Sequence, residues 1–196
     1  SPGKHFLTVK VTTDSEEVWY DYVSFYVSDA KIEEFWHFDA KSAIQGSPVF
    51  SAGLVYFGAW NGTFYALDAQ TGKKKWEFKT PKPIVSTPAV SDNLVYFGST
   101  DANIYALDAA SGTEIWHFTT DGPIQAPPLV ANETVYIGSG DNSLYALDKN
   151  FGKLLWKYQT GALIQSRPLK HQDTIYFGAW DNYFYALEAE TGTEKW

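Results

Sequence analysis

The stretch that decides the fold is residues 65–76, Tyr65-Ala-Leu-Asp-Ala-Gln-Thr-Gly-Lys-Lys-Lys-Trp76. Close copies of it return every forty residues without insertion or deletion. The copies begin at Tyr65, Tyr105, Tyr145 and Tyr185. Tryptophans fall on the same grid, including one a period earlier, at Trp36, Trp76, Trp116, Trp156 and Trp196. A fixed period of this length indicates a repeat architecture.

Each period is predicted to form four short strands. Tyr65 to Leu67 belong to an aromatic strand, residues 68–72 supply the Asp and Gly of a turn, and Trp76 lies in the next strand. Another strand carries a proline in every copy, at Pro48, Pro88, Pro128 and Pro168. Because proline cannot donate to a neighbouring strand, we expect this strand to have an unpaired edge that lines a central channel. Units too small to bury their own apolar face are typical of propeller blades.

The motif is also recognisable. Ala-x-Asp-x-x-Thr-Gly-x-x-x-Trp, at residues 66–76 and, with Ser111 for Thr, at 106–116, resembles the tryptophan-docking repeat of pyrroloquinoline-quinone (PQQ)-type propellers. That family includes the quinoprotein alcohol dehydrogenases and the propeller lipoprotein of the β-barrel assembly machinery. The third copy departs from the motif with Lys149-Asn150-Phe151, and the fourth has Glu188 for Asp.

The resemblance implies an all-β propeller with four four-stranded blades over residues 31–196, half of an eight-bladed ring. It also implies an extracytoplasmic location, and that the tryptophans of the grid hold adjacent blades together. An indole suits this role because it combines a large apolar face with one N–H donor.

Residues 1–30 lie off the grid. Residues 5–11 and 18–27 each have the pattern of a strand, separated by a polar turn over 12–17, so we expect a hairpin. The segment resembles the last strands of an immunoglobulin-like module. Methionine is absent even from the first position, which favours a fragment or processed product of a larger protein.

Composition excludes several classes of function. The formal net charge is -8 and the one dense basic run is residues 73–75, so no nucleic-acid partner is expected. No apolar run is long enough for a membrane span. The absence of cysteine rules out disulfides and thiolate metal sites, and the four histidines (His5, His37, His117, His171) have no metal-ligand spacing.

No catalytic residue is predicted. The recurring acids Asp68, Asp108, Asp148 and Glu188 are explained by the turn. The quinoprotein dehydrogenases carry a cysteine pair and a calcium-centred carboxylate site, whereas this chain has no cysteine and no distinctive carboxylate cluster. PQQ and calcium are therefore implied by the resemblance alone.

Departures from the repeat identify candidate binding residues. Trp60 and Trp180 occupy a hairpin tip where Thr100 and Gly140 stand in the other copies. Exposed loop aromatics suit stacking on sugars or anchoring a protein partner. The structural alternative is packing against a neighbouring loop or against further blades.

A second departure lies at the start of the proline strand. Gln45, Gln125 and Gln165 occur in three copies and Val85 in the fourth, and Arg167 is the only arginine of the chain. At one mouth of the channel these groups would bind a carboxylate or other polar ligand. The alternative is a solvated rim.

Residues 34–39 repeat the outermost strand of a blade, with no blade of their own before them. They would close the ring on the last blade of the same chain, or on a second copy to give an eight-bladed homodimer, or further blades would follow Trp196. We favour the dimer.

The favoured function is a non-catalytic scaffold or binding module for protein or polysaccharide, within a larger extracytoplasmic protein. The rival hypothesis is that the blades belong to a PQQ-dependent dehydrogenase or to an accessory domain of a hydrolase such as a metallophosphoesterase.

Overall fold

The computed structural model describes residues 3–12, 18–27 and 36–196, in two compact units, Ser1–Phe35 and Trp36–Trp196. In the first unit, β1 (Gly3–Thr12) pairs antiparallel with β2 (Val18–Val27) in one continuous register, as the sequence predicted. Residues 13–17 of the predicted turn, and residues 34 and 35 of the segment predicted to repeat an outermost strand, lie outside the described residues. The likeness to an immunoglobulin-like module stays a prediction.

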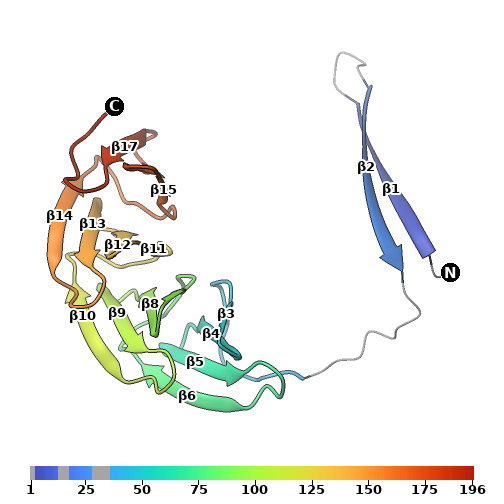
Figure 1. Cartoon of the computed structure of the whole chain (residues 1–196), viewed down its shortest axis with the longest axis horizontal. Helices are drawn as coiled ribbons and strands as arrows, with labels where there is room; N and C mark the ends of the chain where they lie inside the picture. The colour runs from blue at the N-terminus through green and yellow to red at the C-terminus, as the bar shows by residue number, and fades with distance from the viewer. Residues whose placement is uncertain (1–2, 13–17, 28–35) are drawn as a thin grey trace. The chain divides into compact units, whose positions relative to one another are not determined.

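The second unit confirms the all-β repeat. Its four antiparallel sheets, one per forty-residue period, follow one another as a fan (Figure 1). Blade 1 contains β3 (Val49–Ser51), β4 (Leu54–Gly58), β5 (Thr63–Asp68) and β6 (Lys74–Lys79). Blade 2 contains β7 (Ala89–Ser91), β8 (Leu94–Gly98), β9 (Asn103–Asp108) and β10 (Glu114–Thr119). Blade 3 contains β11 (Leu129–Ala131), β12 (Thr134–Gly138), β13 (Ser143–Asp148) and β14 (Leu154–Gln159), and blade 4 contains β15 (Leu169–His171), β16 (Thr174–Gly178) and β17 (Phe184–Glu188).

The proline strands are edge strands, as predicted. One edge of each sheet is formed by the proline strand, which is β3, β7, β11 or β15. Figure 1 shows β3, β11 and β15 on the concave side of the fan and β6, β10 and β14 on the convex side. Each strand begins one residue after its proline, at Val49 after Pro48 in blade 1. The ring nitrogen, which has no hydrogen, therefore stays outside the ladder.

The outermost strand, the fourth one of a blade, is incomplete in blade 4 and in the segment before blade 1. In blade 4 it is held by the bridge between Leu187 and Glu194 and by the bond from Ala186 N to Trp196 O (3.1 Å). The strand predicted over residues 36–38 is not formed: residues 36–40 have no regular structure. The reason is that no sheet among the described residues precedes blade 1 to pair with this segment.

The core lies between blades rather than within them. Tyr56, Phe64 and Trp76 of blade 1 pack against Phe97 and other buried residues of blade 2. The Phe64 and Phe97 rings stack with centroids 4.0 Å apart. Because each side chain of this size stabilises the fold by about 1.5–3 kcal/mol when buried, adjacent blades depend on each other for stability.

A glycine allows the blades to approach so closely. A Cβ atom at Gly98, the last residue of β8, would lie 2.2 Å from Ile124 Cγ2 of the next blade. Gly58 and Gly138 meet Ile84 and Ile164 in the same way. The glycine that ends the second strand of blades 1, 2 and 3 is therefore required by inter-blade packing.

Candidate functional site

The tryptophans of the grid dock each blade on the next. Trp76, Trp116 and Trp156 are buried, at 9%, 8% and 9% exposure. Each indole donates to a backbone carbonyl of the following blade: Trp76 to Ala109 (3.1 Å), Trp116 to Lys149 (3.0 Å) and Trp156 to Ala189 (3.0 Å). Trp36 makes the equivalent bond to Ala69 (3.0 Å), whereas the indole of Trp196 is 64% exposed.

A tyrosine shares each of these carbonyls. The hydroxyls of Tyr56, Tyr96 and Tyr136 donate to the carbonyls of Ala109, Lys149 and Ala189, at 3.0, 3.2 and 3.1 Å. Both lone pairs of the oxygen are thereby used in a buried position, where an unsatisfied polar group would be costly. Burial raises the pKa of all three phenols above their usual value.

Each buried indole packs against the motif turn of the following blade. Gly112 has φ +74° and its absent Cβ would lie 2.6 Å from the Trp76 ring, so two independent constraints select glycine. In blade 1 the Asp68 carboxylate accepts from Thr71 Oγ1 (2.8 Å) and Thr71 N (2.9 Å). These bonds, with Lys75 nearby, lower the pKa of Asp68 to about 2. The repeated acid thus shapes a turn.

Both exceptional tryptophans lie at hairpin tips and are open to solvent. Trp60 follows β4 and is 49% exposed; Trp180 follows β16 and is 68% exposed. Their backbones are anchored as in every copy, by bonds from Trp60 N to Ala43 O (2.9 Å) and from Trp180 N to Leu163 O (3.0 Å). The loop backbone is therefore fixed, while about half of Trp60 and about two thirds of Trp180 are open to solvent.

The glutamine positions lie at the same end of the blades. Gln45 and Gln165 are two residues beyond the carbonyls that anchor the two tryptophan loops. Gln45 and Gln125 are exposed, and the Gln165 amide donates to the Gln125 carbonyl oxygen across two blades. Val85, at the fourth position, is buried.

Arg167 is exposed and lines a pocket of about 440 Å³ beside the inner strands, together with Pro127 of blade 3 and Thr87 of blade 2. Among the described residues its guanidinium makes no ion pair or hydrogen bond. The structure thus places the predicted polar groups on the end that carries Trp60 and Trp180.

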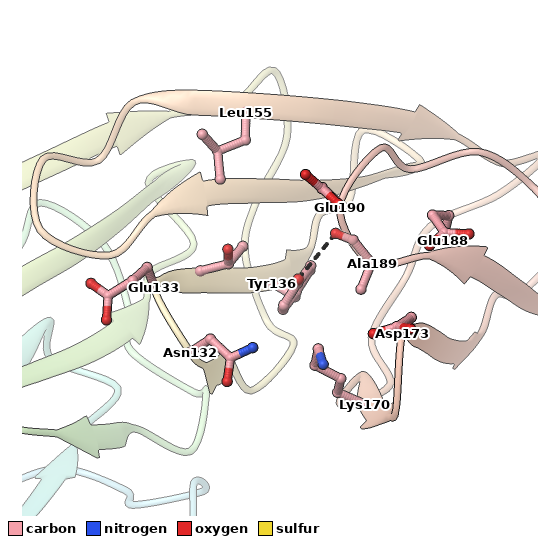
Figure 2. Close-up of a pocket in the computed structure, with 10 residues that line it drawn as sticks. Asn132, Glu133, Tyr136, Leu155, Lys170, Asp173, Glu188, Ala189 and Glu190 are labelled. Carbon is pink, nitrogen blue, oxygen red and sulfur yellow. Dashed lines mark hydrogen bonds between the residues drawn. The ribbon is translucent and has the colours of Figure 1, made fainter.

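A further pocket lies at the opposite end, between blades 3 and 4. Its volume is about 650 Å³ (Figure 2). The lining consists of Asn132, Glu133, Thr134, Tyr136, Leu155, Lys170, Asp173, Glu188, Ala189 and Glu190. Sequence reasoning did not identify it, although the available signal was Lys149, where the other copies have Ala69, Ala109 and Ala189.

A calcium-bound quinone needs a cluster of oxygen ligands, because Ca²⁺ takes six to eight of them. Within the described ranges no group of three or more His, Asp or Glu side chains is placed to hold a metal ion. A helix of sufficient length and apolarity to cross a membrane is likewise not found in the described ranges.

Comparison with known proteins agrees with the geometry. A model of the family described as outer membrane protein assembly factor BamB matches residues 26–126 and 100–196. The chain belongs to the BamB family. No curated protein sequence shows a significant match to it.

Solved structures show the same fold as this BamB family member. BamB from Moraxella catarrhalis is 24% identical with a TM-score of 0.75; the match covers 82% of this chain and 54% of that one. The chain thus spans about half the length of that BamB.

Two further structures extend the comparison. The computationally designed protein Ika4 is 21% identical (TM-score 0.72), with 80% of this chain and 98% of that chain covered. Quinohemoprotein alcohol dehydrogenase ADHIIG from Pseudomonas putida HK5 is 19% identical (TM-score 0.70), with 81% and 34% covered. At these identities the likeness concerns the fold alone.

Proposed function

We propose that this BamB family member is a non-catalytic, extracytoplasmic scaffold that binds a protein partner at the end of the blades carrying Trp60 and Trp180. The observation that supports it is the exposure of two indoles on anchored hairpin tips, where Thr100 and Gly140 serve in the other blades. Tryptophan is enriched among the residues that dominate binding energy at protein interfaces. The location is inferred from the family, whose name places BamB in outer membrane protein assembly.

The rim between these tips supplies polar recognition. Arg167 offers a planar set of donors without a partner among the described residues, and it suits a carboxylate of the bound protein. The Gln125–Gln165 pair retains further donors and acceptors beside it. An apolar anchor flanked by polar groups is the usual anatomy of a protein interface.

We further propose that a second copy completes an eight-bladed ring. Tyr176 and Phe184 on the exposed face of blade 4 are equivalent to Tyr56 and Phe64, which blade 2 buries. Trp36 already docks on Ala69, so residues 36–39 of the second copy, rather than Trp196, would supply the outermost strand that closes on blade 4. Phe184 is 59% exposed on that face, and Ile44 is 47% exposed on the free face of blade 1. The two faces are halves of the contact that blades 1 and 2 already make, so two copies would join head to tail. Light scattering of the 196-residue chain tests this: twice the chain mass supports it, and one chain mass at all concentrations contradicts it.

The partner is tested by photo-crosslinking in the source cells. A photoreactive phenylalanine replaces Trp60 or Trp180 in turn, with Thr100 as the matched hairpin-tip control. The proposal expects one protein, identified by mass spectrometry, at both tryptophan positions and much less at Thr100. A purified interaction with that protein should then weaken by about tenfold or more in Trp180→Ala.

The rival functions have their own readouts. Binding on a glycan array that is lost in the Trp60→Ala, Trp180→Ala double variant would assign the indoles to a polysaccharide instead. Dye reduction on addition of PQQ and calcium would assign the blades to a dehydrogenase. Either result without a crosslinked protein would refute the proposed scaffold role.

A further inference from the structure

Two of the three contacts between blades contain equivalent pockets at the end opposite Trp60. One lies between blades 1 and 2 and has a volume of about 240 Å³. The larger one, of about 650 Å³, lies between blades 3 and 4. Tyr56 and Ala109 line the first at the positions that Tyr136 and Ala189 hold in the second. Comparison of these pockets with the contact between blades 2 and 3 shows what the site accepts.

Between blades 2 and 3 the equivalent position is filled by a lysine of the chain itself. Lys149 stands where Ala109 and Ala189 stand, and only 8% of it is exposed. Its ammonium donates to Asp92 Oδ2 (2.9 Å) and Glu133 Oε1 (3.0 Å). These two hydrogen-bonded carboxylates raise the pKa of Lys149 above its usual value. This contact therefore shows that the repeat can bind an ammonium group between a turn residue of one blade and a turn residue of the next.

The pocket between blades 3 and 4 keeps the oxygen groups and lacks the lysine. Asn132 and Asp173 occupy the positions of Asp92 and Glu133, and Ala189 replaces Lys149. Figure 2 shows Asn132 and Asp173 at the border of the space in front of Tyr136 and Ala189.

The charge of this lining is mainly negative. In the described structure the carboxylates of Asp173 and Glu190 make no ion pair, whereas Glu188 pairs with Lys195 (3.3 Å). The one lysine of the lining, Lys170, donates to the Gln172 carbonyl of its own turn. Two unpaired carboxylates therefore face a space of about 650 Å³.

The adjoining hairpin exposes more apolar surface than its equivalents: blade 2 has one exposed apolar residue there, Ile115 (50% exposed), and blades 1 and 4 have none. Phe151, Leu154 and Leu155 of the β13–β14 hairpin are 71%, 47% and 53% exposed. The equivalent residues of blade 1 are Thr71, Lys74 and Lys75. Leu155 lines the pocket, and Figure 2 shows its side chain directed from β14 toward it. Apolar groups beside carboxylates suit a side chain with an apolar stem and a cationic end.

We propose that this pocket binds a lysine side chain of an extended segment of a partner protein, with apolar neighbours of that lysine on Phe151 and Leu155. The bound ammonium lies between Asn132 and Asp173. It corresponds to the ammonium of Lys149, which lies between Asp92 and Glu133 in the contact of blades 2 and 3. The inference rests on the proposed role in protein binding, and it adds a second docking surface at the opposite end of the blades.

The first test places a lysine of the chain itself in the pocket, by the substitution Ala189→Lys. A fluorescein-labelled peptide of alternating leucine and lysine is titrated by anisotropy, with the fully lysine-acetylated peptide as the ligand control. Ala189→Lys should weaken binding by about tenfold, the effect of losing about 1.4 kcal/mol of contact. Ala109→Lys is the matched control: it makes the same change in charge in the pocket lined by Ala52 and Asn93, and it should leave affinity within about twofold.

A second pair of variants guards against misfolding. Asp173→Asn should weaken binding by about tenfold, because a charge-assisted hydrogen bond is lost, whereas Asp121→Asn, with its carboxylate 90% exposed, should not. Equal losses in both members of either pair would overturn the proposal, since nonspecific attraction to an acidic protein would then suffice. Unchanged binding in Ala189→Lys would also overturn it. Trp60→Ala leaves this pocket intact, so failure of the proposed binding surface at Trp60 and Trp180 is distinguished from failure of this pocket.

Discussion

Trp116→Ala is the substitution that probes the docking of blades most sharply. Trp116 is 8% exposed, and its indole N–H donates to Lys149 O at 3.0 Å. Its ring lies over Gly152, where a Cβ would be 2.6 Å away. Truncation of a buried aromatic side chain costs about 3–5 kcal/mol, which is a large part of the stability of a domain.

The repeat provides a matched control at the same position of the motif. Trp196 is 64% exposed, so Trp196→Ala should change the free energy of unfolding by about 0.5 kcal/mol or less. Trp36 keeps its bond to Ala69 but is only half-buried, and Trp36→Ala should fall between the two.

The assay is urea unfolding followed by far-UV circular dichroism, with midpoints compared at equal slope. The expected order of destabilisation is Trp116→Ala, then Trp36→Ala, then Trp196→Ala. If Trp196→Ala costs as much as Trp116→Ala, contact with a following blade is not what stabilises the indole, and the reasoning is refuted.

Three other predictions concern single groups of the motif. Gly112→Ala should destabilise by about 2–4 kcal/mol in urea unfolding, because it adds a clash to a positive φ, whereas Gly53→Ala, with φ +81° and nothing within 4 Å, should cost only about 1 kcal/mol; equal costs would exclude the clash. Tyr136→Phe should cost about 0.5–1.5 kcal/mol and Tyr176→Phe, whose hydroxyl has no partner in the described structure, close to nothing, as measured by thermal unfolding. Asp68 has a folded pKa of about 2, below its usual 3.8, so its stabilisation is complete above pH 3.8 and lost as the pH falls through 2; Asp68→Asn should remove that part of the acid dependence, and an unchanged pH profile would contradict the assignment.

The repeat made the fold predictable, because each blade uses the same residues for the same contact. From the motif and its resemblance, Trp76 was expected to hold adjacent blades together, and the structure shows its indole against Gly112 of the next blade. The sequence did not predict that Tyr56 shares the Ala109 carbonyl with Trp76, since spacing alone does not say where a hydroxyl points.

The errors lie at the ends of the repeat, where a neighbour decides the structure. Residues 36–38 have the sequence of a strand, yet a strand forms only when another backbone pairs with it. Lys149 was noticed only as a departure from the motif. Its role depends on Asp92, which lies 57 positions away and becomes a neighbour only when two blades meet.

The measurement that tests the account most directly is hydrogen exchange of the indole N–H groups by NMR. It reports the docked and the exposed tryptophans in one experiment. The account predicts slow exchange for Trp76, Trp116 and Trp156, which are buried and hydrogen-bonded, and fast exchange for Trp60 and Trp180. Fast exchange at Trp116 would contradict docking between blades. Slow exchange at Trp60 and Trp180 in the free protein would show that these indoles are already packed and would contradict the proposed binding surface.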